Sequence, residues 1–371
     1  MIKRIAILGG GASARAYAAE LSLRGFDIGI YEAPNYYEKM DRIIEKGGIQ
    51  VNIAPKVDKL QSGFAFIHSV TSEMSQAIKN AEVIIVAVPS HVQLHYANAL
   101  ASILQDGQAV IFSPTIMGIS AYLHKSMRNN ANLADVLLIE AEYIRHMSTV
   151  TKDFDVNING MKNGLSFAAF PSAHNGRAQV LVKELFEDWQ ICSNIFEVAL
   201  RNTNAIFHVP LAVLNAGQID RQSTFAFYAQ GCTEKVANVV DMVEKERIQI
   251  GCALNIDMTP LETVLKGWYG VGSGAWHTLG EALRLNQAYK SIMAPTTLKH
   301  RFLMEDVPYG LAAIESLAKA VNVETPAISS LIILSDILLD GKLHAQAHTL
   351  ETIGLADYDG DGLTQLVTHG F

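Results

Sequence analysis

The stretch IAILGGGASARAYAAELSLRGFDIGIYEA, Ile5 to Ala33, places an apolar strand, three glycines, a helical segment and a second apolar strand in that order. Its glycine loop reads G-x-G-x-x-A at Gly9, Gly11 and Ala14. In such a loop the first glycine permits a tight turn, the second lets the backbone approach a pyrophosphate, and a small third residue lets helix and strand pack closely. The stretch therefore predicts a dinucleotide site, with the phosphates at the positively polarised helix N-terminus.

An acidic residue ends the second strand of this stretch. Glu32 stands where a carboxylate accepts hydrogen bonds from both ribose hydroxyls of an adenosine. The 2′-phosphate of NADP would meet a like charge at that position. The sequence therefore favours NAD as the cofactor and leaves NADP open.

A second candidate cofactor segment is VAVPSH, Val86 to His91, at the end of a later apolar run. Ligands of doubly wound folds bind at the C-terminal ends of the strands, so we expect Pro89 and Ser90 to form a wall of a nicotinamide pocket. The same residues equally fit an ordinary strand-to-helix turn in which Ser90 caps the helix.

The first half of the chain alternates short β-rich runs with helical stretches, as parallel sheets with crossover helices do. The expected strands are RIAILG, DIGIYE, AEVIIVAVP, QAVIFSP and DVLLIEAE, the expected helices include 13–24 and 91–104, IQVNI and GFAFIHSV suggest a hairpin-like insertion, and GLSFAAFP suggests an extension of the sheet. After about Asn202 helical periodicity dominates. We therefore predict an α/β fold, in which a Rossmann-type doubly wound sheet in residues 1–190 precedes a mostly α-helical substrate and catalytic domain in residues 191–371.

Charge and cysteine usage narrow the class of protein. The 371 residues carry 29 Lys and Arg against 37 Asp and Glu, a formal net charge of -8, without a basic block, which argues against a nucleic-acid partner. Three scattered cysteines, Cys192, Cys232 and Cys252, fit neither a disulfide framework nor a zinc site. The first strand starts without a leader, and the longest apolar run falls well short of the ~20 residues of a membrane span. We expect a cytoplasmic protein with no membrane partner.

Two segments of the second half are too polar for plain core helices. NTNAIFHVPLAVLNAG sets His208 in an apolar stretch, and APTTLKHRFLMEDVPYGL gathers His300, Arg301, Glu305 and Asp306 after a proline turn. A histidine and a carboxylate together suit acid–base chemistry near neutral pH. Each segment also has an ordinary interpretation, as a core histidine and as a solvated helix end with a local ion pair.

With these segments the sequence resembles the opine dehydrogenases, the octopine/nopaline dehydrogenase group, over nearly the whole chain. The residues that carry the resemblance are the glycine loop, VAVPSH, AE at Ala141–Glu142, FHVPLAVLNAG at 207–217 and HRFLMEDVPYGL at 300–311. The resemblance implies an NAD(P)H-dependent enzyme that joins the amine of an amino acid to a 2-oxo acid, often pyruvate, reduces the resulting imine, and runs in reverse as an oxidation. We expect a monomer or homodimer.

The resemblance also assigns roles to individual residues. The catalytic histidine falls on His208, the aspartate that pairs with it on Asp306, and the arginine that binds the oxo-acid carboxylate on Arg301. A carboxylate on one imidazole nitrogen fixes the tautomer, and the planar guanidinium grips a carboxylate with two parallel hydrogen bonds. Glu142 matches the family as a substrate-binding residue.

The sequence departs from the family after Glu142, where it reads AEYIRHMSTV. Tyr143, Arg145 and His146 therefore predict a different lining for the amino-acid partner. The glycine-broken, aromatic stretch at 266–283 suggests either a cover over the substrate or an ordinary loop between helices.

Three other interpretations fit the sequence less well. A ketopantoate-reductase or hydroxyacid-dehydrogenase type would carry a lysine near the start of the helical domain, yet no lysine lies between Glu184 and Lys235. A non-catalytic dinucleotide sensor would have lost its catalytic group. DYDGDG at 357–362 resembles half of a calcium loop but has Thr368 where a bidentate Glu is needed, so no metal site is expected.

Overall fold

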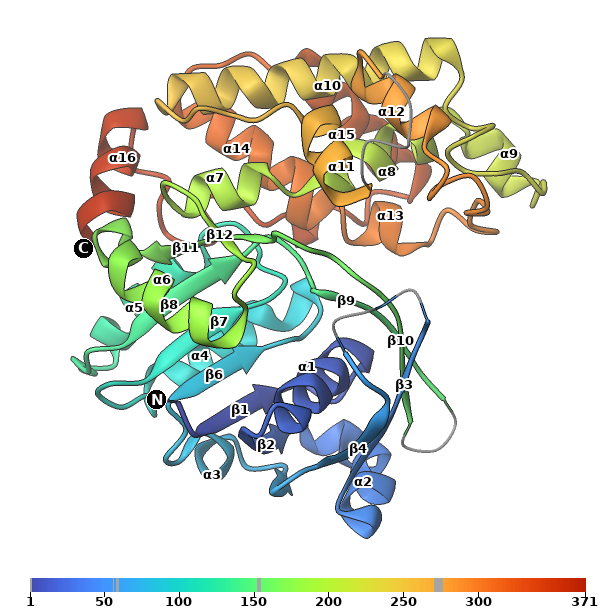
Figure 1. Cartoon of the computed structure of the whole chain (residues 1–371). Helices are drawn as coiled ribbons and strands as arrows, with labels where there is room; N and C mark the ends of the chain where they lie inside the picture. Colours follow the sequence, from blue (N-terminus) through green and yellow to red (C-terminus); the bar gives the residue numbers. More distant parts are fainter. Residues whose placement is uncertain (1, 56, 58–59, 152–154, 270–275) are drawn as a thin grey trace. The chain divides into compact units, whose positions relative to one another are not determined.

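The computed structural model describes residues 2–55, 57, 60–151, 155–269 and 276–371 (Figure 1). The chain divides into two compact units, one of residues 1–198 and 367–371 and one of residues 199–366. The first unit therefore extends beyond the expected limit at residue 190. The short strand β12 (Gln190–Ile191) pairs with the sheet of this unit, and the ring of Phe371 stacks on His124 with centroids 5.8 Å apart. These contacts place the segment after 190 and the C-terminus in the first unit.

The first unit contains an eight-stranded sheet in the order β12-β11-β8-β7-β6-β1-β2-β5. Its other strands are β1 (Arg4–Leu8), β2 (Asp27–Tyr31), β5 (Ser69–Thr71), β6 (Val83–Val86), β7 (Ala109–Phe112), β8 (Leu137–Ala141) and β11 (Ser166–Phe170). All neighbours are parallel except β11, which runs antiparallel to β8. The strand order reverses at β1, and ligands of doubly wound folds bind at such a point. The five predicted strands and the predicted extension are all present.

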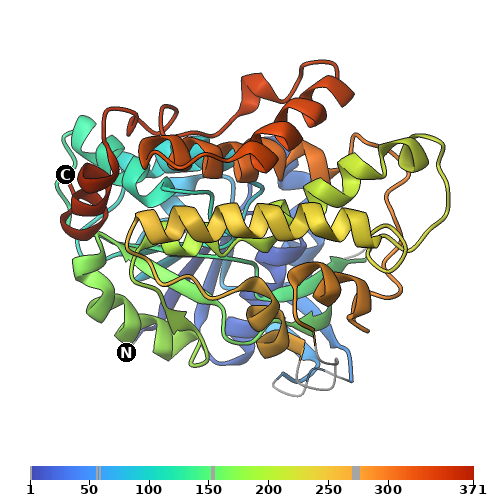
Figure 2. The same ribbon diagram turned by 90° about the horizontal axis from the view of Figure 1, so that it is seen from above.

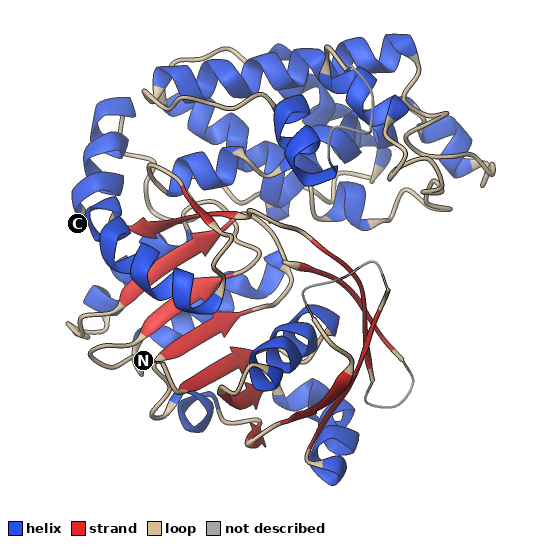
Figure 3. Cartoon of the chain, viewed as in Figure 1, coloured by secondary structure: helices blue, strands red, loops and turns tan. Residues whose placement is uncertain are grey.

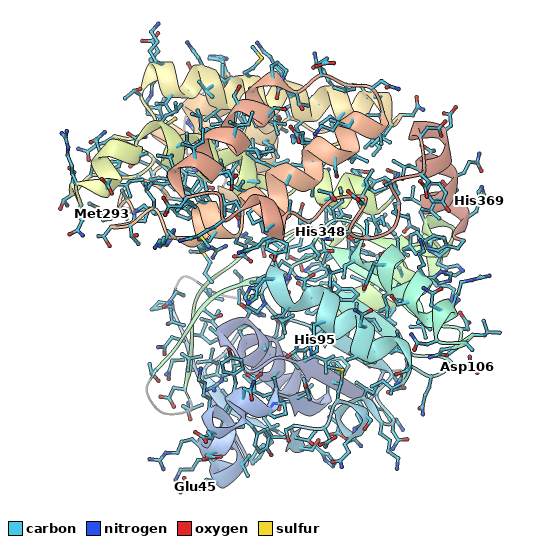
Figure 4. The ribbon with its side chains drawn as sticks, turned by 180° about the vertical axis from the view of Figure 1, so that it is seen from behind. Glu45, His95, Asp106, Met293, His348 and His369 are labelled. Atoms are coloured by element: carbon cyan, nitrogen blue, oxygen red, sulfur yellow. The ribbon has the colours of Figure 1, made fainter. Side chains whose placement is uncertain are left out.

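Helices connect these strands (Figure 3). They are α1 (Ala12–Leu23), α2 (Asp41–Lys46), α3 (Met74–Ile78), α4 (Gln93–Ala101), α5 (Ile119–Asn129) and α6 (Asn175–Leu185), with short helical turns η1 (Pro34–Met40), η2 (Ser90–Val92) and η3 (Ser172–His174). Gly107 and Gly118 have positive φ of 82° and 71°, which glycine adopts at little cost. Glu45 projects from α2 (Figure 4), where it pairs with Arg42 at 2.9 Å on the exposed surface.

A second, four-stranded sheet in the order β4-β3-β10-β9 covers α1. Its strands are β3 (Gly48–Ile53), β4 (Gly63–Phe66), β9 (His146–Val150) and β10 (Val156–Met161). The predicted hairpin is confirmed, since β3 and β4 pair antiparallel. The sequence did not predict β9 and β10, because polar residues such as Thr149 and Asn157 interrupt their apolar pattern. One of these residues, Asn157, accepts a hydrogen bond from Asn52 of β3 at 3.0 Å.

The second unit is helical (Figure 2). It contains α8 (Thr203–Leu214), α9 (Ala216–Asp220), α10 (Glu234–Ala253), α11 (Leu261–Tyr269), α12 (Leu279–Leu285), α13 (Arg301–Met304), η5 (Val307–Leu311), α14 (Ala312–Ala320), α15 (Pro326–Leu338) and η6 (His344–Gln346), while α7 (Ile195–Leu200) and α16 (Gly360–His369) cross its limits. Its one described β-type pairing is the bridge between Ala226 and Met293. The predicted sequence of a sheet followed by helices is confirmed.

The long helix α10 organises the core of this unit and packs against α8, α12 and α15. Arg247 of α10 is fully buried and donates to Glu244 through Nε and Nη2, both at 2.6 Å. Glu246 accepts the backbone N–H groups of Ala327 and Ile328, at 2.7 and 2.9 Å. A carboxylate there satisfies orphan donors at the start of α15 and complements its dipole. In the part of the chain that the structure describes, no helix combines the length and the apolar character needed to cross a bilayer.

Candidate functional site

The glycine loop joins β1 to α1 at the point where the strand order reverses. Gly9 has φ of 119°, and a Cβ there would lie 2.8 Å from the carbonyl oxygen of Ala87. A Cβ on Gly11, in contrast, would meet no atom within 4 Å. Ala14 is fully buried in α1. The first glycine is thus needed for the turn, and the second leaves the backbone open to a ligand.

The middle glycine, Gly10, has a role that the motif did not reveal. A Cβ on Gly10 would collide with the Glu32 carboxylate and the Met40 methyl group. The Glu32 side chain therefore lies directly over the loop. Its Oε1 accepts the N–H of Ala33 at 2.7 Å, and the residue is 9% exposed. The loop and the acidic residue predicted to bind ribose are adjacent.

Arg15 supports this arrangement from the first turn of α1. Its Nε donates to the Gly10 carbonyl at 2.8 Å and its Nη2 donates to the Lys39 carbonyl, also at 2.8 Å. Burial lowers the pKa of Arg15, and the nearby charge of Glu32 opposes that shift. Sequence reasoning missed Arg15, because a basic residue one position after the motif has no distinctive pattern.

Pro89 and Ser90 lie after β6, at the C-terminal ends of the parallel strands. Pro89 is exposed, and Ser90 is buried as the first residue of η2. Gln93 fixes the neighbouring edge, since its Nε2 donates to Pro114 O at 2.8 Å and its Oε1 accepts from Ile116 N at 3.2 Å.

Glu140, at the end of β8, is a buried carboxyl that the sequence reasoning did not single out. Burial raises the pKa of Glu140 to about 7, against hydrogen bonds from Ser120, Thr115 and Gly118 that lower it. The Thr115 hydroxyl lies 2.8 Å from Glu140 Oε2 and 2.9 Å from the Ile116 carbonyl. One hydroxyl has one proton, so if Thr115 donates to Ile116, the carboxyl must supply the proton to Thr115. The two possible positions of the Thr115 proton therefore correspond to the two protonation states of Glu140.

Glu142 is 1% exposed, and its Oε1 accepts the N–H of Ser166 at 2.9 Å. Two of the three residues expected to give a different substrate lining, Arg145 and His146, face a buried carboxylate instead. Arg145 donates to Asp188 at 2.7 Å and lies 3.4 Å from Glu20, and His146 lies 2.7 Å from Glu20. Arg145 and His146 are each 5% exposed, so they serve as buried partners of the α1 carboxylate.

The charges of this buried cluster act on Glu20. Burial would raise the pKa of Glu20, but the hydrogen bond and charge of His146, with the charges of Arg145 and Arg24, outweigh burial and lower it. Tyr17, one turn earlier, bonds to the Ser113 hydroxyl at 2.6 Å, and burial above all raises its pKa to about 12. The cluster fastens α1 to β9.

In the second unit, α8 and η5 bring His208 and Asp306 together. His208 Nδ1 lies 2.6 Å from Asp306 Oδ2, with side-chain exposures of 10% and 7%. The π-helical turn η5 starts directly after Asp306, and its Gly310 packs on α8 so closely that a Cβ would lie 2.5 Å from the Ala205 Cβ. Such turns occur often at functional sites. The motif VPYGL therefore sets the approach of Asp306 to His208.

Arg301 begins α13, close to this pair. Its side chain is 57% exposed and only loosely paired, with Nε 3.8 Å from Glu305 Oε2. His300 caps α13, where its Nδ1 accepts the Phe302 N–H at 3.4 Å. Burial lowers the pKa of His300, the charges of Arg301 and His208 lower it further, and Asp306 opposes them. The second unit thus gathers three of the predicted residues, His208, Asp306 and Arg301.

Aromatic rings surround the imidazole of His208. Phe302 stacks on it with centroids 3.9 Å apart and planes 25° apart, and Phe227 stacks on Phe302 at 4.9 Å and 25°. The centroid of the Tyr228 ring lies 6.3 Å from that of the His208 imidazole. The suggested cover at 266–283 includes residues 270–275, which lie outside the described residues. Its flanking parts form α11 and α12.

The chain is similar to known opine dehydrogenases. Residues 191–339 match the family model described as the alpha-helical domain of NAD/NADP octopine/nopaline dehydrogenase. An opine dehydrogenase of Arthrobacter sp. (strain 1C) is 28% identical over 365 residues, which cover 98% of this chain and 99% of that protein.

Solved structures agree on the fold. An octopine dehydrogenase solved with NADH and L-arginine superposes with a TM-score of 0.84 at 18% identity, over 99% of this chain and 98% of the other. A ketopantoate reductase from Ralstonia eutropha JMP134 gives 0.61 at 14% identity, over 93% of this chain and 100% of the other. The family model matches the helical half, and the curated relative extends the similarity to opine dehydrogenases over nearly the whole length of the chain.

Proposed function

We propose that this chain catalyses the NAD(P)H-dependent reductive condensation of an amino acid with a 2-oxo acid, and the reverse oxidation, with pyruvate as the expected oxo acid. The observation that carries the proposal is the buried contact of 2.6 Å between His208 Nδ1 and Asp306 Oδ2, beside the exposed Arg301. A secondary amine dicarboxylate is the expected product. Condensation of the amine and the carbonyl releases water, and reduction of the imine then requires one hydride and one proton.

His208 is proposed to exchange that proton. Because Nδ1 faces Asp306, the second ring nitrogen, Nε2, is the one to meet the substrate amine. Asp306 would hold the ring in one tautomer and stabilise the imidazolium. An ordinary imidazole titrates near pH ~6.5, so it can give and take a proton at neutral pH.

Arg301 is proposed to bind the carboxylate of the oxo acid. Its guanidinium is exposed, and its contact with Glu305 at 3.8 Å is too long to satisfy a planar set of donors. A bidentate carboxylate would replace that loose contact and orient the carbonyl carbon for reaction.

The residues of the first unit fit a dinucleotide. The open surface at Gly11, the turn at Gly9 and the carboxylate of Glu32 suit a pyrophosphate and a ribose. Reduced NAD(P), when bound, supplies the hydride that reduces the imine. Glu32 is proposed to make NADH the preferred form, and Pro89 and Ser90 to line the nicotinamide site. Glu142, which directly follows β8, is proposed as a substrate-binding residue.

The test is a screen of NADH oxidation with pyruvate and each common amino acid, with single-substrate controls and mass analysis of the product. Turnover that requires both substrates and yields the secondary amine dicarboxylate would support the proposal. Turnover with the oxo acid alone would instead indicate a hydroxyacid dehydrogenase. Tight NADH binding without turnover would indicate a dinucleotide sensor.

Two coarser features belong to the same proposal. The chain has three scattered cysteines, too few for a disulfide framework, as suits a reducing compartment, and we place the enzyme in the cytoplasm. We expect it to act as a monomer or homodimer, which size-exclusion chromatography with light scattering would establish.

A further inference from the structure

We infer that Phe302 is a positioning residue for His208 that sets the plane of the imidazole and favours its charged form. This inference rests on the proposed role of His208. The resemblance to the opine dehydrogenases assigned roles to its neighbours Arg301 and Asp306 and none to Phe302.

A hydrogen bond to one ring nitrogen does not by itself define the plane of an imidazole. The contact between His208 Nδ1 and Asp306 Oδ2 fixes one ring nitrogen, but coupled rotations about the two side-chain torsions of His208 can still tilt the ring. Phe302 covers one face of the imidazole, with centroids 3.9 Å apart and an angle of 25° between the planes. The hydrogen bond and the stacked face together define the direction in which Nε2 points.

Phe302 is itself held from several sides. The fully buried ring of Phe227 stacks on Phe302 with centroids 4.9 Å apart, and the ring of His300 contacts Phe302 edge-on at 4.4 Å. The N–H of Phe227 donates to Ile292 O at 2.8 Å, next to the bridge between Ala226 and Met293. Met293 is labelled in Figure 4. A buried aromatic ring and a short β-bridge therefore restrict the orientation of the Phe302 ring.

The stack also acts on the charge of the imidazole. The face of a phenyl ring carries negative charge density and attracts a cation within about 6 Å of its centre. Asp306 contacts Nδ1 of His208, His300 lies close enough for its charge to interact with that of His208, and the ring of Tyr228 lies 6.3 Å from the imidazole. The phenyl face and the Asp306 carboxylate therefore attract positive charge on the same ring.

The experiment compares Phe302→Leu with Phe302→Tyr and with Phe225→Leu. Phe225 is a matched control, because it is buried in the same loop as Phe227 and its ring lies beside Gly231. We expect Phe302→Leu to lower kcat about 10²-fold through misorientation, with KM for NADH and the oxo acid nearly unchanged. The alkaline fall of the reductive rate should move to lower pH. Phe302→Tyr should retain the wild-type kcat and the wild-type pH of the alkaline fall. Phe225→Leu should change neither quantity.

Nuclear magnetic resonance of ¹³C-labelled histidine gives a readout that needs no turnover. The ring current of Phe302 shifts the His208 resonance, which is assigned by its loss in His208→Asn. Phe302→Leu should remove that shift and lower the pH of its titration midpoint, and Phe302→Tyr should keep both. The inference is overturned if Phe302→Leu leaves the resonance and its midpoint unchanged, or if it lowers kcat no more than Phe225→Leu does. An enzyme that fails the amino-acid screen yet shows these resonance changes would refute the proposed function and retain the positioning role.

Discussion

Gly310 touches Ala205, and this contact sets how closely Asp306 approaches His208. A Cβ on Gly310 would lie 2.5 Å from the Ala205 Cβ, well inside van der Waals contact. Ala205 lies one turn before His208 on α8, and Gly310 lies one turn after Asp306 in η5. Two backbones pressed together at this point bring the imidazole and the carboxylate to 2.6 Å.

Gly310→Ala should therefore damage the pair through the backbone. We expect a loss of stability of about 1–3 kcal/mol from overpacking, together with a fall in kcat, as Asp306 moves away from His208. The double variant Gly310→Ala with Ala205→Gly removes the clash and should recover kcat, although glycine in a helix costs about 1 kcal/mol. Denaturant melts and steady-state kinetics measure both. A double variant as slow as the single one would show that the contact does not set the distance.

Cofactor preference should depend on Glu32. Its carboxylate lies over Gly10 and would repel a 2′-phosphate, so we expect a higher kcat/KM with NADH than with NADPH. Glu32→Ala should reduce the difference in kcat/KM between NADH and NADPH, mainly by lowering KM for NADPH. Kinetics with both cofactors decide the matter, and a wild-type preference for NADPH would contradict the prediction.

Arg301 should affect the oxo acid and not the cofactor. Arg301→Ala removes the proposed partner of the carboxylate and should raise KM for the oxo acid far more than KM for NADH. Arg301→Lys keeps the charge but not the planar pair of donors, so it should recover only part of the loss. An unchanged oxo-acid KM and kcat in Arg301→Ala would leave Arg301 as the surface ion-pair partner of Glu305.

Glu140 should make stability depend on pH. Its pKa is raised to about 7 in the folded chain, so the folded state holds the proton more tightly than the unfolded state does. Stability from this residue is complete below its unfolded pKa near 4.5 and is lost as pH rises through 7. Glu140→Gln keeps a hydrogen-bond donor toward Thr115 and does not titrate. Relative to wild type, this variant should gain roughly 3 kcal/mol between pH 4 and pH 8.

Denaturant melts across this pH range provide the measurement for Glu140. The exposed Glu187 gives the control, since Glu187→Gln should follow the wild-type curve at every pH. Parallel curves for Glu140→Gln and wild type would show that folding does not change the pKa of Glu140, against the prediction.

The sequence predicted those parts of the molecule that depend on local pattern. Apolar runs such as Ile5–Leu8, which is fully buried, predicted the main sheet, and the glycine loop predicted the turn between β1 and α1. Long-range pairing has no such pattern. β9 is polar as an edge strand, β10 buries only alternate residues, and Glu140 and Arg15 became notable only through partners distant in sequence.

The same distinction explains the error at Arg145 and His146. A basic residue and a histidine after a family motif suggested a substrate lining, but both face Glu20, which lies more than a hundred residues earlier on α1. A charged residue in a helix is normally exposed, so nothing in the residue pattern of α1 indicated that Glu20 is buried. His208 and Asp306 were predicted correctly as a pair only through the resemblance, since 98 residues separate them.

His208 and Asp306 should behave as one catalytic unit. His208→Ala should lose roughly 10²–10⁴-fold in kcat, the usual value of general acid–base catalysis. Asp306→Asn should lose a comparable amount, because the amide holds the ring in the wrong tautomer. The double variant should be little slower than either single variant, since the effects of substitutions within a catalytic unit are not additive.

Reduction should slow at high pH as the imidazolium loses its proton, and oxidation of the product should favour alkaline pH. Comparison of melting temperature with turnover separates this role from a structural one. A His208→Ala variant that melts at a lower temperature but turns over normally per folded molecule would refute the catalytic assignment.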